Sequence, residues 1–327
     1  QDEWQLNDAI TLIAGVRFDE YKSDDAPILN PVFQTRYGFS NQQTFDGLEL
    51  VQPRLGLTWD LPSNSLGETQ LSFGYGVFGG GDPTVHFANA YQNFGGAIGA
   101  GEFGLGQFDS QDAPCTAADL QVTDANGQFT GLPDCVRVAA ANSANANTGA
   151  VAAVDPNFEL PENHRWNIGL NHIMSSDNAW LDGWEIQADY IYTDHKNAVD
   201  WVDLRLSPNG VSLPDGRPQY FEVDPTRAGC NATFNGIRQG FSGALDDIDP
   251  VTGINPCDDT RNSNQDILMT NGVEGSTKSF SVQFARDIDF TDRTSLNVGL
   301  GYAGLDAEVG NPVNSSTAGS SDEEVAV

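Results

Sequence analysis

The sequence contains few basic residues and no long apolar run. Lys and Arg together number 15, and Lys occurs only at positions 22, 196 and 278, whereas Asp and Glu number 46, so the formal net charge is −31. A nucleic-acid surface needs a basic patch, so this composition argues against nucleic acid as a partner. No run of 18 apolar residues occurs, which excludes a membrane-spanning helix.

Motifs that carry chemistry are equally scarce. The four histidines are scattered, and neither H-E-x-x-H nor G-x-S-x-G occurs. The glycines at Gly79–Gly81 are followed by neither a Lys nor a predicted helix, so they do not resemble a phosphate-binding loop. We therefore predict that the chain is not an enzyme.

Alternation of apolar and polar residues is the main pattern that is present. A period of two predicts strands with one apolar face, as where Leu71, Phe73 and Tyr75 alternate with Ser72 and Gly74. Seven stretches show this pattern, at about Trp4–Tyr21, 51–60, 69–79, 163–174, 184–193, 279–284 and 295–302.

The connections between these stretches alternate between short and long, which is typical of an up-and-down barrel with turns on one side of a bilayer and loops on the other. A soluble β-sandwich would also show alternation. Aromatic residues near strand ends, such as Trp59 and Trp166, favour the bilayer. We predict an all-β fold, an antiparallel up-and-down transmembrane β-barrel of which this chain supplies about seven to eight strands. The long extracellular loops are expected at about 22–50, 80–162, 207–276 and 306–327.

The strand count is odd, whereas bacterial single-chain barrels have an even number of strands. A missed or merged strand is one explanation, and Val199 to Leu206 is a candidate for a separate strand. Our other expectation is that residues 1–327 are part of one β-barrel domain in a longer polypeptide, with a plug domain and the remaining strands outside this chain.

Four cysteines fall in two pairs, each inside one predicted long loop: Cys115 with Cys135, and Cys230 with Cys257. No C-x-x-C occurs, so a zinc site is not indicated. Pairing within each loop is the simplest of the three connectivities that four cysteines allow. Two disulfides would place these loops in an oxidising compartment, either the cell exterior or the periplasm.

Two groups of charged residues are candidates for binding. Closely spaced carboxylates beside Cys257 offer the hard oxygen ligands that Ca²⁺ prefers, although the twelve-residue EF-hand loop is absent and loop solvation is the simpler interpretation. These carboxylates are Asp246, Asp247, Asp249, Asp258 and Asp259. Ca²⁺ is the one candidate cofactor. Arg17, Arg54 and Arg165 lie on the polar faces of their strands, so in a barrel they face the lumen and either pair with carboxylates of neighbouring strands or a plug, or contact substrate.

The sequences of several segments, taken in order, resemble the barrel of TonB-dependent outer-membrane receptors. The resemblance is carried by TLIAGVRFDEY, VQPRLGLTWDL, LSFGYGVFGG, VDPNFELPENHRWNIGLN, YIYTDHKNAVDWVDLRL, DGRPQY and ILMTNGVEGSTKSFSVQFAR. More narrowly, the chain resembles the Oar-like group, whose full chains carry a carboxypeptidase-regulatory-like domain ahead of the plug. No single segment is highly specific, and the ordered set extends over about residues 4 to 305.

The resemblance implies an energised importer in the bacterial outer membrane with extracellular loops. Its barrel would enclose a plug, and TonB would pull on an N-terminal segment that is not in this chain. The implied partners are outer-membrane lipid, TonB and an extracellular substrate or surface protein. The alternatives are a secreted, disulfide-stabilised β-rich adhesin or binding module, and a passive or structural surface barrel.

Overall fold

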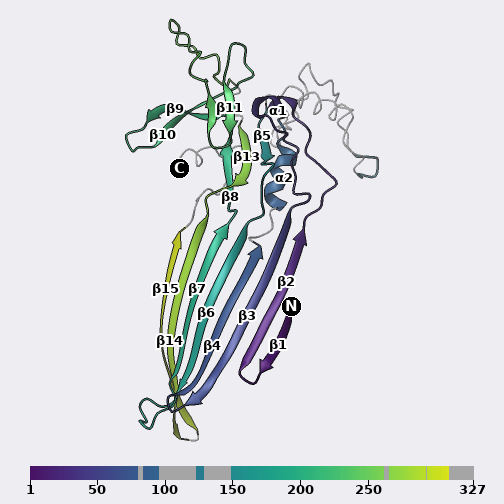
Figure 1. Cartoon of the computed structure of the whole chain (residues 1–327). Coiled ribbons are helices and arrows are strands. Elements are labelled where there is room, and N and C mark those ends of the chain that lie inside the picture. Colours follow the sequence, from purple (N-terminus) through teal and green to yellow (C-terminus); the bar gives the residue numbers. More distant parts are fainter. Residues whose placement is uncertain (80–83, 96–122, 129–148, 261–264, 292, 309–327) are drawn as a thin grey trace.

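The computed structural model describes residues 1–79, 84–95, 123–128, 149–260, 265–291 and 293–308. Its main body is a curved antiparallel sheet of eight long strands in the order β1-β2-β3-β4-β6-β7-β14-β15 (Figure 1). Each strand therefore pairs with the next long strand along the chain, as in an up-and-down barrel. The strands are β1 (Asp2–Asn7), β2 (Ile10–Glu20), β3 (Glu49–Asn64), β4 (Gly67–Gly79), β6 (Glu162–Met174), β7 (Glu185–Lys196), β14 (Gly275–Thr291) and β15 (Thr294–Glu308).

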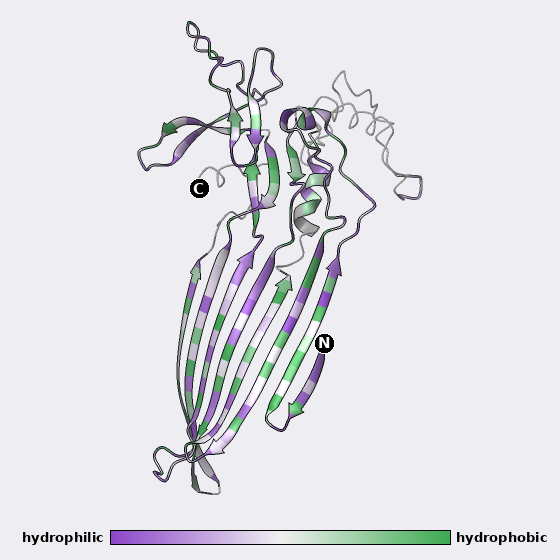
Figure 2. Cartoon of the chain, in the orientation of Figure 1, coloured by the Kyte–Doolittle hydropathy of each residue, from purple (hydrophilic) through white to green (hydrophobic). Residues whose placement is uncertain are grey.

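Each pair of neighbouring strands aligns polar with polar and apolar with apolar positions, so the sheet has two distinct faces. Along each strand hydrophobic and hydrophilic residues follow one another in bands (Figure 2). We call the side bearing Arg17, Arg54 and Arg165 the polar face and the opposite side the apolar face, because the strand register places these three arginines on one side. In a soluble sandwich a second sheet would cover the apolar face.

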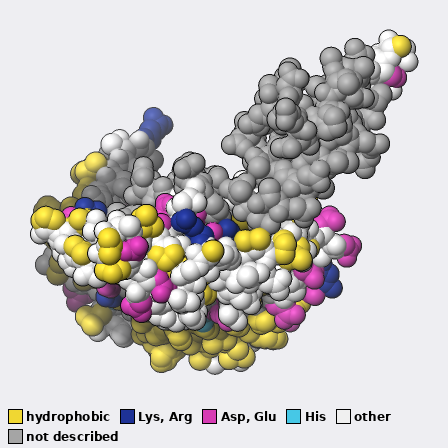
Figure 3. Space-filling view, turned by 90° about the horizontal axis from the view of Figure 1, so that it is seen from above, with side chains coloured by type: hydrophobic (Ala, Val, Ile, Leu, Met, Phe, Trp, Pro, Cys, Tyr) yellow, Lys and Arg dark blue, Asp and Glu magenta, His cyan; other side chains and the backbone are white. Residues whose placement is uncertain are grey.

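Side chains of the apolar face remain exposed instead. Val16 is 68%, Ile168 51% and Leu300 71% exposed, which is the arrangement that contact with lipid requires. Seen from above, hydrophobic side chains gather along one side of the molecule (Figure 3). The predicted all-β, antiparallel up-and-down architecture is thus confirmed, as an open sheet within the described residues.

The first predicted strand, Trp4–Tyr21, is wrong in extent because it comprises two strands. β1 and β2 form a hairpin whose turn holds Asp8 and Ala9, and the Asn7 side chain accepts a hydrogen bond from the Ala9 amide at 2.9 Å. An Asx-type contact of this kind reverses the chain without Gly or Pro. The extra strand makes the number of strands in the sheet even.

The candidate strand Val199–Leu206 exists, but it lies outside the long sheet. Residues Val199–Asp203 form β8, the edge of a three-stranded sheet in the order β5-β13-β8. This sheet belongs to what we call the cap, the described parts of residues 21–48, 84–95, 149–161 and 197–274, which lie at the long-loop end of the strands (Figure 1). The expected long loops therefore carry regular structure.

The cap combines two short helices, the three-stranded sheet and two hairpins around its own core. Buried Phe33, Leu204, Val223 and Leu268 form part of one cluster. Among the described residues, both helices are too short and too polar to span a bilayer. The elements are α1 (Pro31–Tyr37), α2 (Thr84–Gln92), β5 (Val151–Val154), β8 (Val199–Asp203), β9 (Leu206–Ser212), β10 (Pro218–Glu222), β11 (Thr233–Gly236), β12 (Gly240–Ser242) and β13 (Asp266–Asn271).

Helix α1 is fixed at both ends by its own sequence. The Asn30 side chain accepts hydrogen bonds from the amides of Val32 and Phe33, and Pro31 occupies the first turn, where no amide donor is needed. Gly38 ends the helix at φ 81°, a left-handed conformation that glycine adopts without strain. The result is a short, rigid support that presents Arg36 and Tyr37 to the cap interior.

Candidate functional site

The polar face has two depressions, one near the cap and one near the short turns. The outer depression has a volume of about 310 Å³ and is lined by Arg17, Asp19, Tyr21, Leu50, Gln52, Gly79, Leu160 and Pro161. The inner one has a volume of about 340 Å³ and is lined by Asp60, Leu61, Ser63, Glu68, Thr69, Gln70, Asn171 and Ile173. Both lie on the surface that a closed barrel would turn towards its lumen.

In the outer depression polar groups are held in place across β2, β3 and β4. The Arg17 Nε donates to Asp19 at 2.8 Å, and the Gln52 side-chain amide donates to the other Asp19 oxygen at 2.6 Å. The Gln52 carbonyl in turn accepts from the Gly79 amide at 3.2 Å. Gln52 is buried, so its amide is positioned by these contacts, whereas the guanidinium of Arg17 stays open to solvent. Leu50 and Leu160 supply apolar walls, so the depression combines polar and apolar surface.

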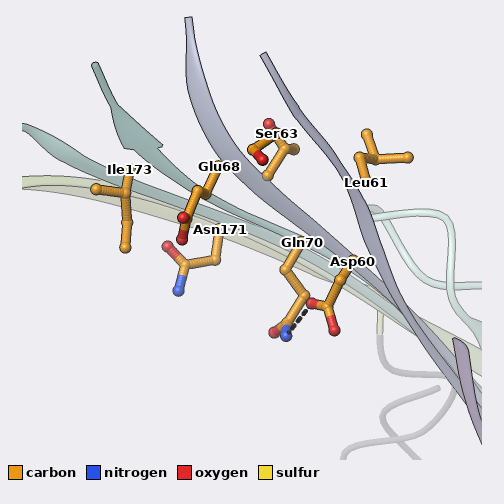
Figure 4. Close-up of a pocket in the computed structure, with 8 residues that line it drawn as sticks. Asp60, Leu61, Ser63, Glu68, Gln70, Asn171 and Ile173 are labelled. Carbon is orange, nitrogen blue, oxygen red and sulfur yellow. Dashed lines mark hydrogen bonds between the residues drawn. The ribbon is translucent and has the colours of Figure 1, made fainter. Parts of the chain in front are cut away.

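The inner depression is lined mainly by carboxylate and amide groups. Figure 4 shows Asp60, Gln70 and Asn171 side by side, with the Gln70 amide donating to Asp60 at 2.7 Å. The Asn171 carbonyl oxygen is buried and has no hydrogen-bond partner within the described chain. This surface offers acceptors, and the acidic Glu68 adds negative charge.

The three arginines expected to face the lumen do share one face, but their partners differ. Arg17 pairs with Asp19, two residues along its own strand rather than on a neighbouring strand. Arg54 and Arg165 instead lie over the ring of Phe78, with guanidinium carbons 4.8 and 5.7 Å from its centroid. No sequence pattern indicated this stacking, because Phe78 breaks the apolar-polar alternation at the end of its strand.

The five carboxylates considered for Ca²⁺ do not form one site. Asp247 accepts from the backbone and side-chain amides of Asn231 at 2.9 Å, Asp249 caps a turn, and the buried Asp259 faces Arg205. No three His, Cys, Asp or Glu side chains within the described ranges converge as metal ligands. The described fold thus does not gather Asp246, Asp247, Asp249, Asp258 and Asp259 into one cluster, and Ca²⁺ binding stays a prediction.

One of the two proposed disulfides lies in the described part of the chain. Cys230 and Cys257 are bonded, with 4.8 Å between their α-carbons, and the buried Cys257 packs in the cap core. This bond joins the segment after β10 to the segment before β13. Cys115 and Cys135 lie outside the described residues, so their pairing stays a prediction.

Two buried arginines connect the segments of the cap, and sequence reasoning missed both. Arg205, with 1% of its side chain exposed, contacts Asp203 and Asp259 at 3.4 Å and Glu222 at 3.3 Å. Arg36 of α1 contacts Asp224 at 3.1 Å and Asp266 at 3.7 Å. The only sequence signal was the interleaving of Asp203 and Arg205 with apolar residues.

Burial changes the acidity of the carboxyls in this network. Removal from water raises the pKa of Asp203 to about 6, against the opposing attraction of Arg205, and nearby Asp266 adds to the increase. Burial also raises the pKa of Asp224, but hydrogen bonds from Arg36 and Thr226 outweigh it and bring that pKa below its usual value. Asp203 therefore gains a proton in mildly acidic solution.

One protein family matches the sequence of this chain. The family model described as TonB dependent receptor-like, beta-barrel matches residues 1–228. Among curated proteins, none matches the chain in sequence.

The solved structures that align with this chain are much longer than it is. The FrpB iron transporter of Neisseria meningitidis (F5-1 variant) aligns over 93% of this chain and 25% of its own, with 10% identity and a TM-score of 0.34. The copper transporter OprC aligns over 95% and 29%, with 9% identity and a TM-score of 0.34. The hemophore receptor HasR of Serratia marcescens aligns over 90% and 43%, with 10% identity and a TM-score of 0.26. The chain thus spans about a quarter of the length of the first two.

Proposed function

Since this chain belongs to the TonB dependent receptor-like β-barrel family of the bacterial outer membrane, we propose that it forms one side of the barrel of an active nutrient importer. The family comprises transporters rather than enzymes. In this proposal the apolar face contacts outer-membrane lipid, the polar face lines the lumen, and the cap lies outside the cell. TonB would act through a plug and an N-terminal segment supplied by the rest of a longer polypeptide.

The observation that supports this proposal best is the pairing of one exposed apolar face with one mainly polar face across the eight strands. A lipid-facing surface requires the first, and a solute pathway requires the second. The outer depression, with Arg17, Asp19 and Gln52, lies where a solute entering past the cap would first meet the sheet. The ordered segments quoted from the sequence further support placement in the Oar-like group.

The first test is the intact mass and terminal peptide sequence of the native protein extracted from outer membranes. The proposal expects a chain far heavier than 35.1 kDa, with a plug-like domain upstream and further strands downstream. A native mass near 35.1 kDa with these termini would contradict the importer and favour a small structural barrel.

The second test separates active import from passive passage. Three strains are compared for the solutes they remove from a complex medium: one with the full-length protein, one without it, and one lacking TonB. The proposal expects at least one solute to be removed only when both proteins are present. Removal that persists without TonB would identify a passive barrel, and no difference among the strains would contradict transport.

A further inference from the structure

Arg54 and Arg165 lie in one row of the sheet, separated by Gly76 on the strand between them. Their α-carbons are therefore roughly 10 Å apart, two strand spacings. Phe78, the next residue on the same face of β4, places its ring between the two guanidinium groups. A side chain at Gly76 would collide with this ring, because a β-carbon at that position would lie 2.8 Å from the ring edge. Glycine at position 76 thus allows the ring to fold back between the arginines.

Arg54 and Arg165 lack the carboxylate partner that half of the described arginines have, and unlike Arg227 and Arg286 they also have no backbone carbonyl partner within the described chain. Arg17, Arg36, Arg205, Arg217 and Arg238 each form an ion pair. Within the described chain, neither Arg54 nor Arg165 has one, although acidic residues outnumber basic ones by 46 to 15. The buried Arg54 Nε also has no hydrogen-bond partner there.

The two positive charges beside this ring repel each other, and a nearby anion would offset that repulsion. Stacking on a ring occupies the flat side of a guanidinium and leaves its N–H groups at the edge free to donate. Such a planar fork matches the two oxygens of a carboxylate or phosphate. Arg165 is exposed and Phe78 is half-buried, so an anion can reach the pair from the polar face.

We propose that Arg54 and Arg165, held around Phe78, bind the carboxylate or phosphate group of a solute in the barrel lumen. The proposal deepens the importer function and rests on it, because it takes the polar face to be the lumen wall. It assigns the transported solutes to anionic compounds. The site adjoins the outer depression, since Phe78 directly precedes Gly79, which lines that depression.

The first experiment uses the full-length protein in detergent and phenylglyoxal, a reagent that modifies accessible arginines. Modification of each arginine is followed by peptide mass spectrometry, with and without citrate, and with tetramethylammonium chloride at matched ionic strength. We expect Arg54 and Arg165 to react, and citrate to slow both at least about tenfold. Arg217, which is exposed at a hairpin turn of the cap and paired with Asp215, provides the comparison and should not respond to citrate.

Two results would overturn the proposal. Equal modification rates with and without citrate would mean that the pair binds no carboxylate. Arg54 and Arg165 that stay unreactive in every condition would mean that an acidic side chain from elsewhere in the protein already occupies them.

The second experiment measures citrate and inorganic phosphate binding by calorimetry. The double variant Arg54→Gln/Arg165→Gln should lose at least about tenfold in affinity for the anion that binds, and Phe78→Leu should lose part of it, while Arg217→Gln keeps the wild-type affinity. Binding unchanged in the double variant would overturn the site. This measurement needs no TonB, so the two proposals can fail separately. Loss of anion binding with uptake intact would contradict only the anion site. Loss of uptake with anion binding intact would contradict only the importer.

Discussion

Arg205 holds three carboxylates of the cap around one buried guanidinium. It connects Asp203 at the end of β8, Glu222 at the end of β10 and Asp259 in the following segment, which are distant from one another in sequence. A buried ion pair often adds little net stability, but removing one partner leaves an uncompensated buried charge. This asymmetry makes Arg205 a sensitive test of the cap.

Arg205→Ala is expected to lower the free energy of unfolding of the cap by about 3–5 kcal/mol, because Asp203 and Asp259 would remain buried without it. Hydrogen exchange of the Leu268 and Val223 amides reports this loss, since both lie in the cap core. The matched control is Arg217→Ala, whose pair with Asp215 is exposed. Unchanged protection of Leu268 in Arg205→Ala would show that the network does not hold the cap.

Asp203 gives the cap a dependence on pH. Its pKa is raised to about 6 in the folded protein, above the value of about 4 of an unfolded Asp. The folded cap therefore takes up a proton between these values, and its stability increases as the pH falls through 6. Between pH 7.5 and pH 5 the gain is expected to be on the order of 1 kcal/mol.

Hydrogen exchange of cap amides at several pH values, corrected for intrinsic rates, measures this gain. In Asp203→Asn the increase between pH 7.5 and pH 5 should disappear. The lowered pKa of Asp224 acts in the opposite direction, but only below about pH 4. Protection that falls as the solution is acidified to pH 5 would contradict this assignment.

At the scale of single elements, two adjacent residues of strand β14 lie on opposite faces of the sheet. Phe284 lies on the apolar face and is 37% exposed, and Gln283 lies on the polar face opposite Gln187. Phe284→Arg is expected to destabilise the full-length barrel in lipid by about 2–4 kcal/mol, as charges near the bilayer midplane do. Gln283→Arg, its neighbour, should have little effect.

Urea unfolding of the lipid-embedded full-length protein compares these two variants. Equal losses at Phe284 and Gln283 would contradict the assignment of the two faces.

The elements themselves were largely predictable from sequence. Strict alternation located β3, β4, β6, β7, β14 and β15, because a strand with one lipid-facing side must repeat with a period of two. The hairpin of β1 and β2 was missed because its turn at Asp8 and Ala9 contains neither Gly nor Pro. Of the cap strands only β8 was a candidate, and β5 and β13 were missed because they are buried on both faces and so do not alternate.

At the scale of the whole molecule, sheet and cap are stabilised by different means. The sheet depends on its strand pairing and on lipid, whereas the cap has its own apolar core and the Cys230–Cys257 bond. A loop of 27 residues closed by a disulfide is stabilised by roughly 3 kcal/mol in the chain-entropy model. The two parts should therefore respond differently to reduction.

Cys230→Ser/Cys257→Ser is expected to increase hydrogen exchange at Val223 and Leu268 while leaving exchange at Ile168 and Leu170 of β6 unchanged. The same comparison on the wild-type protein with and without a thiol reductant serves as a control. Faster exchange in β6 would show that the cap also supports the sheet.

The sequence by itself determined the long strands, their two faces and the membrane class, because these depend on a local period of two that a lipid-facing sheet imposes. It also indicated the pairing of Cys230 with Cys257. Only the tertiary structure decided which charges meet. Arg36 finds Asp224 and Asp266 across about 190 to 230 positions of the chain, and Arg54 and Arg165 converge on Phe78 through strand register. Contacts of that kind follow from how distant segments pack, and no local pattern in the chain records them.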